Sequence, residues 1–182
     1  LISRSDRVRA NRLRERLVSG EIPKHVSIIL DGNRRFAWNK SSKTAVGHTE
    51  GKEKLKEVMD WVLDLGVPYF TVYALSTENI SERDSEELEI LYDLYVSGLD
   101  EISMDPRIHD RGVKVQVVGR LDMLPAKVRK SIENAENLTS HYSDFTFTVC
   151  LAYGGREEIV DAVKSVATDY ASGTLDINSI NS

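Results

Sequence analysis

Short apolar runs alternate with longer amphipathic segments along most of the chain. The runs are rich in β-branched and aromatic residues, as buried strands are, and they span residues 26–30, 69–75, 113–118 and 145–151. The segments between them repeat apolar residues at i, i+3 and i+4, which predicts helices, and they span residues 47–65, 84–102, 121 to about 141, and a last segment that Gly173 ends. The alternation predicts a single α/β domain, with a mostly parallel sheet flanked by helices and right-handed crossovers.

Each predicted helix has an apolar stripe that we expect to be buried. The four stripes are Leu55, Val58, Met59, Val62 and Leu65; Leu88, Leu91, Tyr92, Tyr95 and Leu99; Val128, Ile132, Ala135 and Leu138; and Ile159, Val163, Val166 and Tyr170. The first two helices would be natural walls of an apolar tunnel. Ordinary core packing produces the same periodicity, so the pattern leaves both interpretations open.

Two segments lie outside this alternation. Residues 3–18 predict a basic helix, within an N-terminal segment (1–22) that precedes the domain (23–182). The apolar face of this helix is thin, which favours a solvated helix over a contact with a membrane surface. Residues 37–46 have no periodicity and predict a polar loop, in a natural position for a flap beside a ligand.

The composition narrows the class of protein. A length of 182 residues, with 41% hydrophobic and 29% charged residues, describes one globular domain. The net charge of −5 argues against a nucleic-acid partner. The one cysteine, Cys150, lies in an apolar run and predicts a buried small side chain rather than a nucleophile. No apolar run approaches the roughly 18 residues of a membrane span, so we expect a cytoplasmic protein. The chain begins at Leu1 and ends in a polar run without a closing element, so we expect it to be part of a longer protein.

Candidate chemistry gathers where the first predicted strand ends. Asp31-Gly32-Asn33 predicts a sharp turn that carries a carboxylate, and Arg34 and Arg35 follow where a helix should begin. Ligands of open α/β sheets bind at the carboxyl ends of the strands, and a helix N-terminus suits phosphate. A carboxylate there could hold Mg²⁺ together with phosphate oxygens. The turn therefore predicts a Mg²⁺–diphosphate site, although a plain turn with a solvated helix start has the same sequence.

Polar groups also follow the second predicted strand. Ser76, Thr77, Glu78 and Asn79 come directly after it, and neighbouring strands that end in polar clusters share one pocket rim. His48, at the start of the 47–65 helix, is expected at the same end of the sheet. Gly154-Gly155-Arg156 after the fourth strand indicates either a further phosphate turn or tight strand-to-helix packing.

Five blocks of sequence resemble the cis-prenyltransferases, the undecaprenyl diphosphate synthase family. They are Asp31-Gly-Asn-Arg-Arg-Phe-Ala37, Gly47-His-Thr-Glu-Gly51, Tyr73-Ala-Leu-Ser-Thr-Glu-Asn79, Val118-Gly-Arg120 and Tyr153-Gly-Gly-Arg-Glu-Glu-Ile159. They agree in order and spacing, and the resemblance covers about residues 23–175.

The resemblance implies a Mg²⁺-dependent enzyme that joins isopentenyl diphosphate to an allylic diphosphate, such as farnesyl or geranylgeranyl diphosphate, with cis geometry. It implies a sheet of about six strands, an apolar tunnel, a homodimer and substrates that lead to a membrane lipid carrier. Asp31 would position Mg²⁺ and, with Asn79, serve catalysis; an amide is a weak base, so we favour an orienting role for Asn79. The residues expected to bind substrate are Gly32, Asn33, Arg34, Arg35, Phe36, His48, Ser76, Thr77, Glu78 and Arg83.

The chain departs from the family pattern at several positions. Thr44 stands where the family usually has an arginine, with Lys43 beside it, and Glu82 stands at another such position, with Arg83 next. Ile80 replaces an aromatic residue. The family's later segments, which bind isopentenyl diphosphate and supply a glutamate to Mg²⁺ from the partner subunit, have no counterpart before Ser182.

Two other functions were weighed against this hypothesis. A non-catalytic partner subunit of a heteromeric cis-prenyltransferase would typically lose the Asp31–Arg35 block, which is intact. A Mg²⁺-dependent phosphohydrolase would need a second carboxylate two residues after Asp31, where the chain has Asn33. The sequence therefore favours the prenyltransferase.

Overall fold

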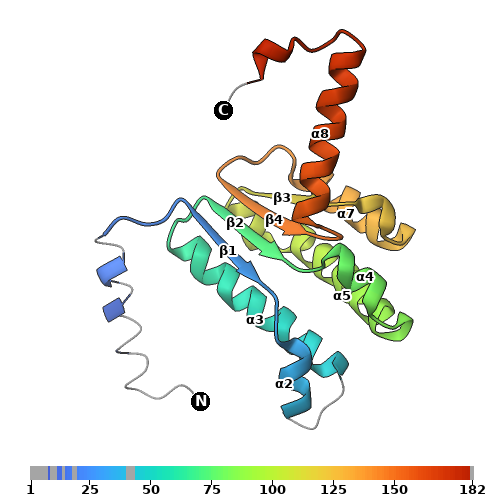
Figure 1. Cartoon of the computed structure of the whole chain (residues 1–182). Helices are drawn as coiled ribbons and strands as arrows, with labels where there is room; N and C mark the ends of the chain where they lie inside the picture. The colour runs from blue at the N-terminus through green and yellow to red at the C-terminus, as the bar shows by residue number, and fades with distance from the viewer. Residues whose placement is uncertain (1–7, 9–11, 14, 18–19, 40–43, 181–182) are drawn as a thin grey trace.

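The computed structural model describes residues 8, 12–13, 15–17, 20–39 and 44–180. At its centre is a parallel sheet of four strands in the order β1-β2-β4-β3 (Figure 1). The strands are β1 (His25–Ile29), β2 (Tyr69–Tyr73), β3 (Val113–Val118) and β4 (Phe145–Cys150). This confirms the predicted α/β class and the positions of all four strands.

Alternation along the strands divides the sheet into two unlike faces. In β2, β3 and β4, residues two apart are buried, among them Phe70, Val115 and Phe147, and they pack on helices. The residues between them, such as Thr71, Gln116 and Thr148, are polar and half-buried. The period of two follows from the pleat of a strand, and it assigns the core to one face of the sheet.

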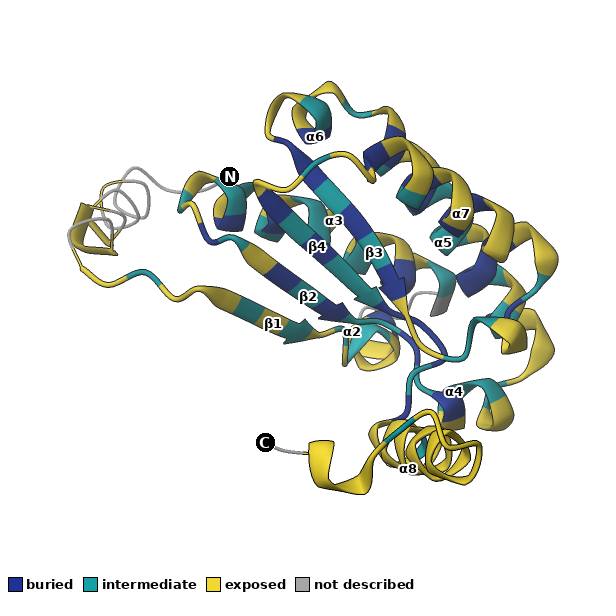
Figure 2. Cartoon of the chain, turned by 90° about the horizontal axis from the view of Figure 1, so that it is seen from above, coloured by how far each residue is buried: buried dark blue, intermediate teal, exposed yellow. Residues whose placement is uncertain are grey.

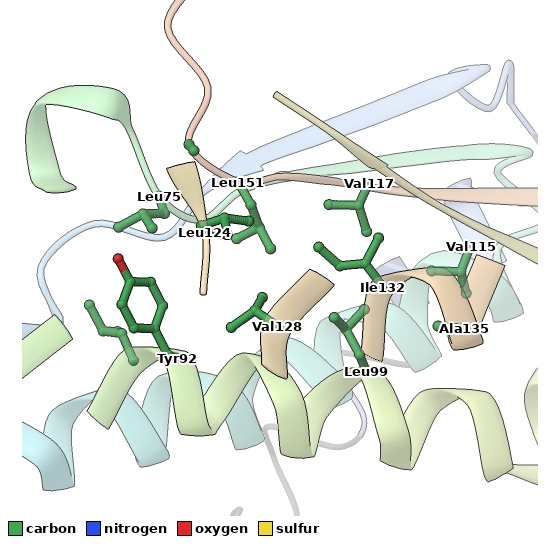
Figure 3. Packing of buried hydrophobic residues seen from close by; sticks show 12 residues of the cluster. Leu75, Tyr92, Leu99, Val115, Val117, Leu124, Val128, Ile132, Ala135 and Leu151 are labelled. Atoms are coloured by element: carbon green, nitrogen blue, oxygen red, sulfur yellow. The ribbon is translucent and has the colours of Figure 1, made fainter. Parts of the chain in front are cut away.

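Three long helices cover that apolar face. They are α3 (Thr44–Asp64), α5 (Ser85–Met104) and α7 (Ala126–Thr139). The helix α5 packs on both α3 and α7, and the core between α5, α7 and β3 contains Leu99, Val117 and Ile132 (Figure 3). The predicted stripes of these three helices are buried or half-buried, except that Leu138 is exposed.

The two edges of the sheet differ. Beside β3, side chains of α7 accept the outward amides: Val115 N donates to Thr139 Oγ1 (3.0 Å) and Val117 N donates to Glu136 Oε1 (2.8 Å). No strand of the described residues lies beyond β1 (Figure 2), and Ile29 at the end of β1 is 74% exposed. Of the roughly six strands that the resemblance implies, the described residues hold four, and β1 is the edge without cover.

Helix α2 (Asn33–Asn39) follows β1, where the sequence predicted a helix start. Three short elements were not predicted as separate helices: α4 (Thr77–Glu82) follows β2, α6 (Pro106–Asp110) follows α5, and the 3₁₀ turn η1 (Leu121–Met123) precedes α7. A second 3₁₀ turn, η2 (Ile177–Ser179), lies near the C-terminus. The predicted loop 37–46 is wrong at 37–39 and 44–46, which are helical, while 40–43 lie outside the described residues. Buried Ala37, packed beside α3, explains why the chain stays helical there.

The last helix, α8 (Gly155–Ala171), contradicts its predicted burial. Its stripe is exposed, at 67% for Ile159, 62% for Val163, 40% for Val166 and 55% for Tyr170. Figure 1 shows α8 standing away from the sheet, and no described element covers its apolar side. Periodicity showed that this helix is amphipathic, but it could not show whether a neighbour within this chain covers the stripe.

In the N-terminal segment, only residues 8, 12–13 and 15–17 of the predicted helix 3–18 are described, and they are helical and exposed. The rest of that prediction lies outside the described residues. None of the helices in the described ranges has the length and apolar character needed to cross a membrane.

Candidate active site

A cavity of about 660 Å³ lies between α3, α5 and the carboxyl ends of β1 and β2. At one end its lining is polar, with groups from the β1–α2 turn, α3 and α4. Deeper, the lining is apolar, from Leu55, Met59, Leu63, Leu91, Leu94, Leu99, Ile102, Ile108 and Phe147. The sequence left a tunnel and a filled core equally open; the structure shows open space between these two helices.

The turn after β1 presents the carboxylate of Asp31 to solvent. Gly32 makes the turn with a φ of +89°, a conformation that side chains disfavour. Asp31 Oδ1 accepts the Gly32 amide (2.5 Å), and Oδ2 accepts Arg35 Nη2 (3.0 Å). The side chains of Asp31 and Arg35 are 76% and 74% exposed, so this ion pair is weak and a ligand can compete for either group.

Two glycines bring α2 against α3. A Cβ on Gly47 would lie 2.2 Å from the Asn33 backbone oxygen, and one on Gly51 would lie 2.7 Å from the Asn33 side chain. These glycines are one helical turn apart, so together they form a flat strip on α3 that accepts the start of α2. The Gly-His-x-x-Gly spacing thus has a structural reason, and it places His48 beside the β1–α2 turn.

His48 belongs to a buried polar network with Glu87 and Arg83. Its Nε2 lies 3.0 Å from Glu87 Oε1, and the same oxygen accepts Arg83 Nη1 (2.5 Å). Arg34 Nη1 is 4.0 Å from Glu87 Oε2. Burial lowers the pKa of His48 below its ordinary value, and the hydrogen bond that His48 donates to Glu87 opposes that shift in part. His48 is therefore a neutral donor to Glu87 at neutral pH.

The loop after β2 is fixed by hydrogen bonds at both ends. Ser76 caps α4, and its Oγ accepts the Asn79 amide (3.0 Å). Arg83 Nη2 donates to Asn79 Oδ1 (3.1 Å), which leaves the Asn79 NH₂ group on the opposite side of the amide. Arg83 stands one position away from the family's arginine, yet it lines the cavity, whereas Glu82 is exposed and does not.

Residues after β4 support this loop from behind. Tyr153 N donates to Leu75 O (3.1 Å), and Tyr73 OH donates to Tyr153 O (2.7 Å). Tyr153, Gly154, Gly155 and Arg156 do not line the cavity. The block that starts at Tyr153 therefore acts as packing for the Ser76 loop. Cys150 is buried and free, and burial raises the pKa of its thiol.

Nine of the twelve predicted site residues line the cavity: Asp31, Gly32, Asn33, Arg34, Arg35, His48, Ser76, Asn79 and Arg83. Phe36, Thr77 and Glu78 do not: Phe36 is 40% exposed on α2, Thr77 is buried, and Glu78 is exposed on α4. Lys43 and the side chain of Thr44 lie outside what the structure describes. Sequence reasoning missed Glu87, although its spacing of four from Arg83, between the end of α4 and the first turn of α5, was a signal for an ion pair.

Ion pairs join α3 to α5 and α6 along the cavity. Lys52 Nζ and Lys56 Nζ each lie 2.6 Å from a carboxylate oxygen of Glu101, which joins α3 to α5. Arg107 on α6 reaches Asp60 on α3 at 2.8 Å. All five residues line the cavity. Most are half-exposed, so these pairs add little stability; their effect is to surround an apolar space with a charged margin.

The acidic groups fit a Mg²⁺ ion that arrives with phosphate, and not a metal held by protein alone. Among the residues described, no three side chains of histidine, cysteine, aspartate or glutamate form a metal cage. Asp31 offers one exposed carboxylate beside two arginines, and Mg²⁺ commonly binds through one or two carboxylates, water and substrate phosphate oxygens. The donor set at Asp31 therefore fits a Mg²⁺–diphosphate.

Comparison with known proteins gives a match over most of the chain. Residues 29–182 match a family model described as "Putative undecaprenyl diphosphate synthase". The chain belongs to the undecaprenyl diphosphate synthase family of cis-prenyltransferases.

Relatives in this family include two archaeal enzymes named tritrans,polycis-undecaprenyl-diphosphate synthase (geranylgeranyl-diphosphate specific). The chain is 47% identical to the one from Methanopyrus kandleri over 169 residues, which is 93% of this chain and 62% of that protein. It is 46% identical to the one from Pyrococcus horikoshii over 167 residues, 92% of this chain and 63% of that protein. The chain therefore spans less than two thirds of the length of these relatives.

A solved cis-prenyltransferase-like structure has the same fold. It is lavandulyl diphosphate synthase from Lavandula x intermedia in complex with dimethylallyl diphosphate. The TM-score is 0.79 at 29% sequence identity, over 87% of this chain and 67% of that one. The mostly parallel sheet with flanking helices is thus the fold that the family resemblance implied.

Proposed function

We propose that this chain forms the allylic-substrate half of a cis-prenyltransferase, which condenses isopentenyl diphosphate with an allylic diphosphate to give a polyprenyl diphosphate. One observation carries the proposal: a cationic rim at Arg34, Arg35 and Arg83 opens directly into an apolar cavity. A diphosphate on a hydrocarbon chain has the same division, with a charged head and an apolar tail. Relatives named as specific for geranylgeranyl diphosphate support that compound as the primer.

The rim residues suit the loss of diphosphate from an allylic carbon. As the carbon–oxygen bond breaks, negative charge grows on the leaving oxygens, and fixed donors stabilise it. The backbone amides at the start of α2 and the guanidinium groups of Arg34 and Arg35 would bind those oxygens, and arginine does so with paired hydrogen bonds. His48 would face the same group from α3.

Bound Mg²⁺, held by Asp31 and phosphate oxygens, would neutralise part of the charge on the leaving diphosphate. Asp31 would hold the metal, and Arg35, whose ion pair with Asp31 is exposed and weak, would bind phosphate. The NH₂ group of Asn79, oriented by the bond from Arg83 to its oxygen, would donate to a phosphate oxygen and orient the second substrate. A phosphate oxygen of the leaving group is a better base than an amide for the proton that must leave.

The growing prenyl chain would bind in the apolar part of the cavity. Leu55, Met59, Leu91 and Leu99 border the cavity from both helices, and transfer of apolar surface from water contributes about 25 cal/mol per Å². Burial of apolar surface would favour binding of the hydrocarbon tail without selecting the geometry of its double bonds. We extend the proposal to a homodimer that works in the cytoplasm at the membrane surface, where a polyprenyl product would leave. The alternative of a non-catalytic partner gains no support from relatives that are named as synthases.

The test is an assay of the full-length protein with radiolabelled isopentenyl diphosphate and geranylgeranyl or farnesyl diphosphate. Products are separated by chain length, with and without Mg²⁺ and with a chelator. We expect labelled polyprenyl diphosphate that requires both the primer and Mg²⁺. A folded, dimeric preparation that forms no labelled product with any allylic primer would refute the proposal.

A further inference from the structure

Glu87 is an acid in a place where the proposed function calls for cations. It lies in the first turn of α5, and its side chain is only 10% exposed. Three basic side chains converge on it: His48 from α3, Arg83 from the end of α4, and Arg34 from α2. A carboxylate so close to a diphosphate site would repel the ligand unless it serves another purpose.

The need for a counter-charge follows from the convergence of cations. Arg34 and Arg83 carry permanent charge, and like charges brought together in a partly dehydrated site repel each other strongly. Glu87 neutralises part of that charge and connects the three elements on which the rim is built. Glu87 Oε1 accepts from both His48 and Arg83, so it determines where both side chains point.

Glu87 also sets the hydrogen-bonding state of His48. Because a carboxylate can only accept, the imidazole must donate from Nε2. In the neutral ring, Nδ1 then has no proton to give to an anion. Only the imidazolium form has a second N–H, and a neighbouring carboxylate favours that form. The charged and titratable groups that face His48 are Glu87, Arg83 and Arg34, and both arginines oppose its protonation.

We infer that Glu87 is a positioning residue of the allylic diphosphate site: it holds His48 and Arg83 in place and fixes the His48 ring with Nε2 as its donor. The inference rests on the proposed function, and it adds a residue that does not touch the substrate. The first turn of α5 supplies a neighbour for comparison. Neither glutamate lines the cavity, but Glu86 is exposed, whereas Glu87 is bound by His48 and Arg83.

The experiment uses the full-length protein and four variants: Glu87→Gln, His48→Gln, the double variant, and Glu86→Gln as the matched control. Affinity for geranylgeranyl diphosphate is measured by calorimetry, and kcat and KM by the labelled assay. If Glu87 positions the site, Glu87→Gln weakens primer binding and raises its KM by about 10- to 100-fold, the range for one charge-assisted hydrogen bond. Glu86→Gln stays at wild-type values, and the unfolding midpoint shows that Glu87→Gln is folded.

The double variant tests whether Glu87 acts through His48. We expect the losses of Glu87→Gln and His48→Gln to be far from additive, as for residues that share a network. As the pH falls, protonation of His48 adds a second N–H, which should raise the affinity for the primer. In Glu87→Gln this rise in affinity should occur at a lower pH, because the anion that favours the imidazolium is gone.

Three results would overturn the inference. Tighter or unchanged primer binding in Glu87→Gln would make Glu87 a mere counter-charge. Strictly additive losses would show that it does not act through His48. An equal loss in Glu86→Gln would indicate a general charge effect. Failure of the proposed function looks different, because the wild-type protein itself would then neither bind the primer nor elongate it.

Discussion

Asp31 combines a fixed position with an exposed carboxylate. It lies between β1 and α2, with one oxygen bound by the Gly32 amide and the other by Arg35. The sequence predicted the sharp turn and the helix start after it, because Gly32 and Asn33 follow an apolar run and two arginines come next, although a plain turn has the same sequence. Glu87 was not foreseen, because its partner His48 lies 39 positions away and only the fold brings them together.

Asp31→Ala should abolish turnover while the fold remains intact. The side chain is 76% exposed and its ion pair with Arg35 is weak, so its removal costs the native state little. Loss of the group that positions Mg²⁺ would remove several kcal/mol of transition-state stabilisation. The measurement is kcat in Mg²⁺ for the full-length protein, beside Asp100→Ala, which removes an exposed carboxylate outside the cavity. A near-normal kcat for Asp31→Ala would exclude Asp31 from the mechanism.

Arg35→Ala should weaken binding of the allylic primer by about 1.5–3 kcal/mol, the range for a hydrogen bond to a charged group. His48→Ala should also weaken it, because Glu87, which His48 and Arg83 share, loses one of its partners. Both side chains line the polar end of the cavity. Calorimetry with farnesyl or geranylgeranyl diphosphate measures the effect, and Arg129→Ala, exposed on α7 and away from the cavity, is the control. Unchanged affinity in either variant would remove that residue from the diphosphate site.

His48 should also make stability depend on pH. Burial lowers its pKa in the native state, so an unfolded His48, with an ordinary pKa near 6.5, takes up its proton first as the pH falls. Unfolding then binds a proton below about pH 6.5, and the free energy of unfolding decreases there. Urea denaturation above and below that pH should show a smaller decrease in His48→Gln than in wild type. The exposed His141→Gln should behave as wild type.

Among the helices and strands, the strands and the long helices were predictable, and the short helices were less so. Strands β1 to β4 and helices α3, α5 and α7 carry enough apolar repeats to show their period. Helices α2, α4 and α6 have seven, six and five residues, too few for a period to be recognised. Two of them, α2 and α4, carry site residues, and the sequence predicted only the start of α2. The short helices that shape the rim were therefore the least predictable elements.

The contact of α2 with α3 gives a prediction about glycine. Gly47→Ala places a Cβ against the Asn33 backbone, which cannot turn aside as a side chain can. We expect a loss of about 1–3 kcal/mol in unfolding free energy, as for overpacking, and a larger loss of primer affinity because α2 carries the rim. Gly98→Ala is the matched control within a helix: its Cβ would meet only Lys52 Cε, at 4.0 Å.

For Gly98→Ala the expected sign is opposite. An alanine in a helix interior stabilises by roughly 0.5–1 kcal/mol relative to glycine when nothing obstructs it. Chemical denaturation of both variants gives the comparison. Equal effects of the two substitutions on unfolding free energy would show that contact with α2 is not the reason for a glycine at position 47.

At the scale of the whole molecule, the residues that the structure describes leave two apolar or unpaired surfaces without cover: the outer edge of β1 and the stripe of α8. Edge strands that remain open tend to associate. The curated relatives named above extend well past the length of this chain, which spans 62% and 63% of them. The sequence could predict an incomplete sheet from the family resemblance, but the identity of the open edge required the strand order.

We expect that residues 1–182 alone bind an allylic diphosphate and do not elongate it. The residues proposed for the allylic site lie around one cavity within this chain. The family's segments for isopentenyl diphosphate have no counterpart before Ser182. Without them the second substrate lacks a fixed diphosphate, and the reaction loses much of the advantage of oriented reactants, which can reach ~7–11 kcal/mol.

Aggregation through the β1 edge would also abolish elongation, because it would remove folded protein from solution. Circular dichroism and size-exclusion chromatography must therefore first show a folded, soluble sample. Primer binding is then measured by calorimetry, and elongation by the labelled assay, beside the full-length protein at equal concentration. Binding within about tenfold of full length, a difference of about 1.4 kcal/mol, would show that the allylic site is complete in this chain. Labelled polyprenyl product from folded residues 1–182 would contradict the prediction, because both diphosphate sites would then have to lie between α2 and α8.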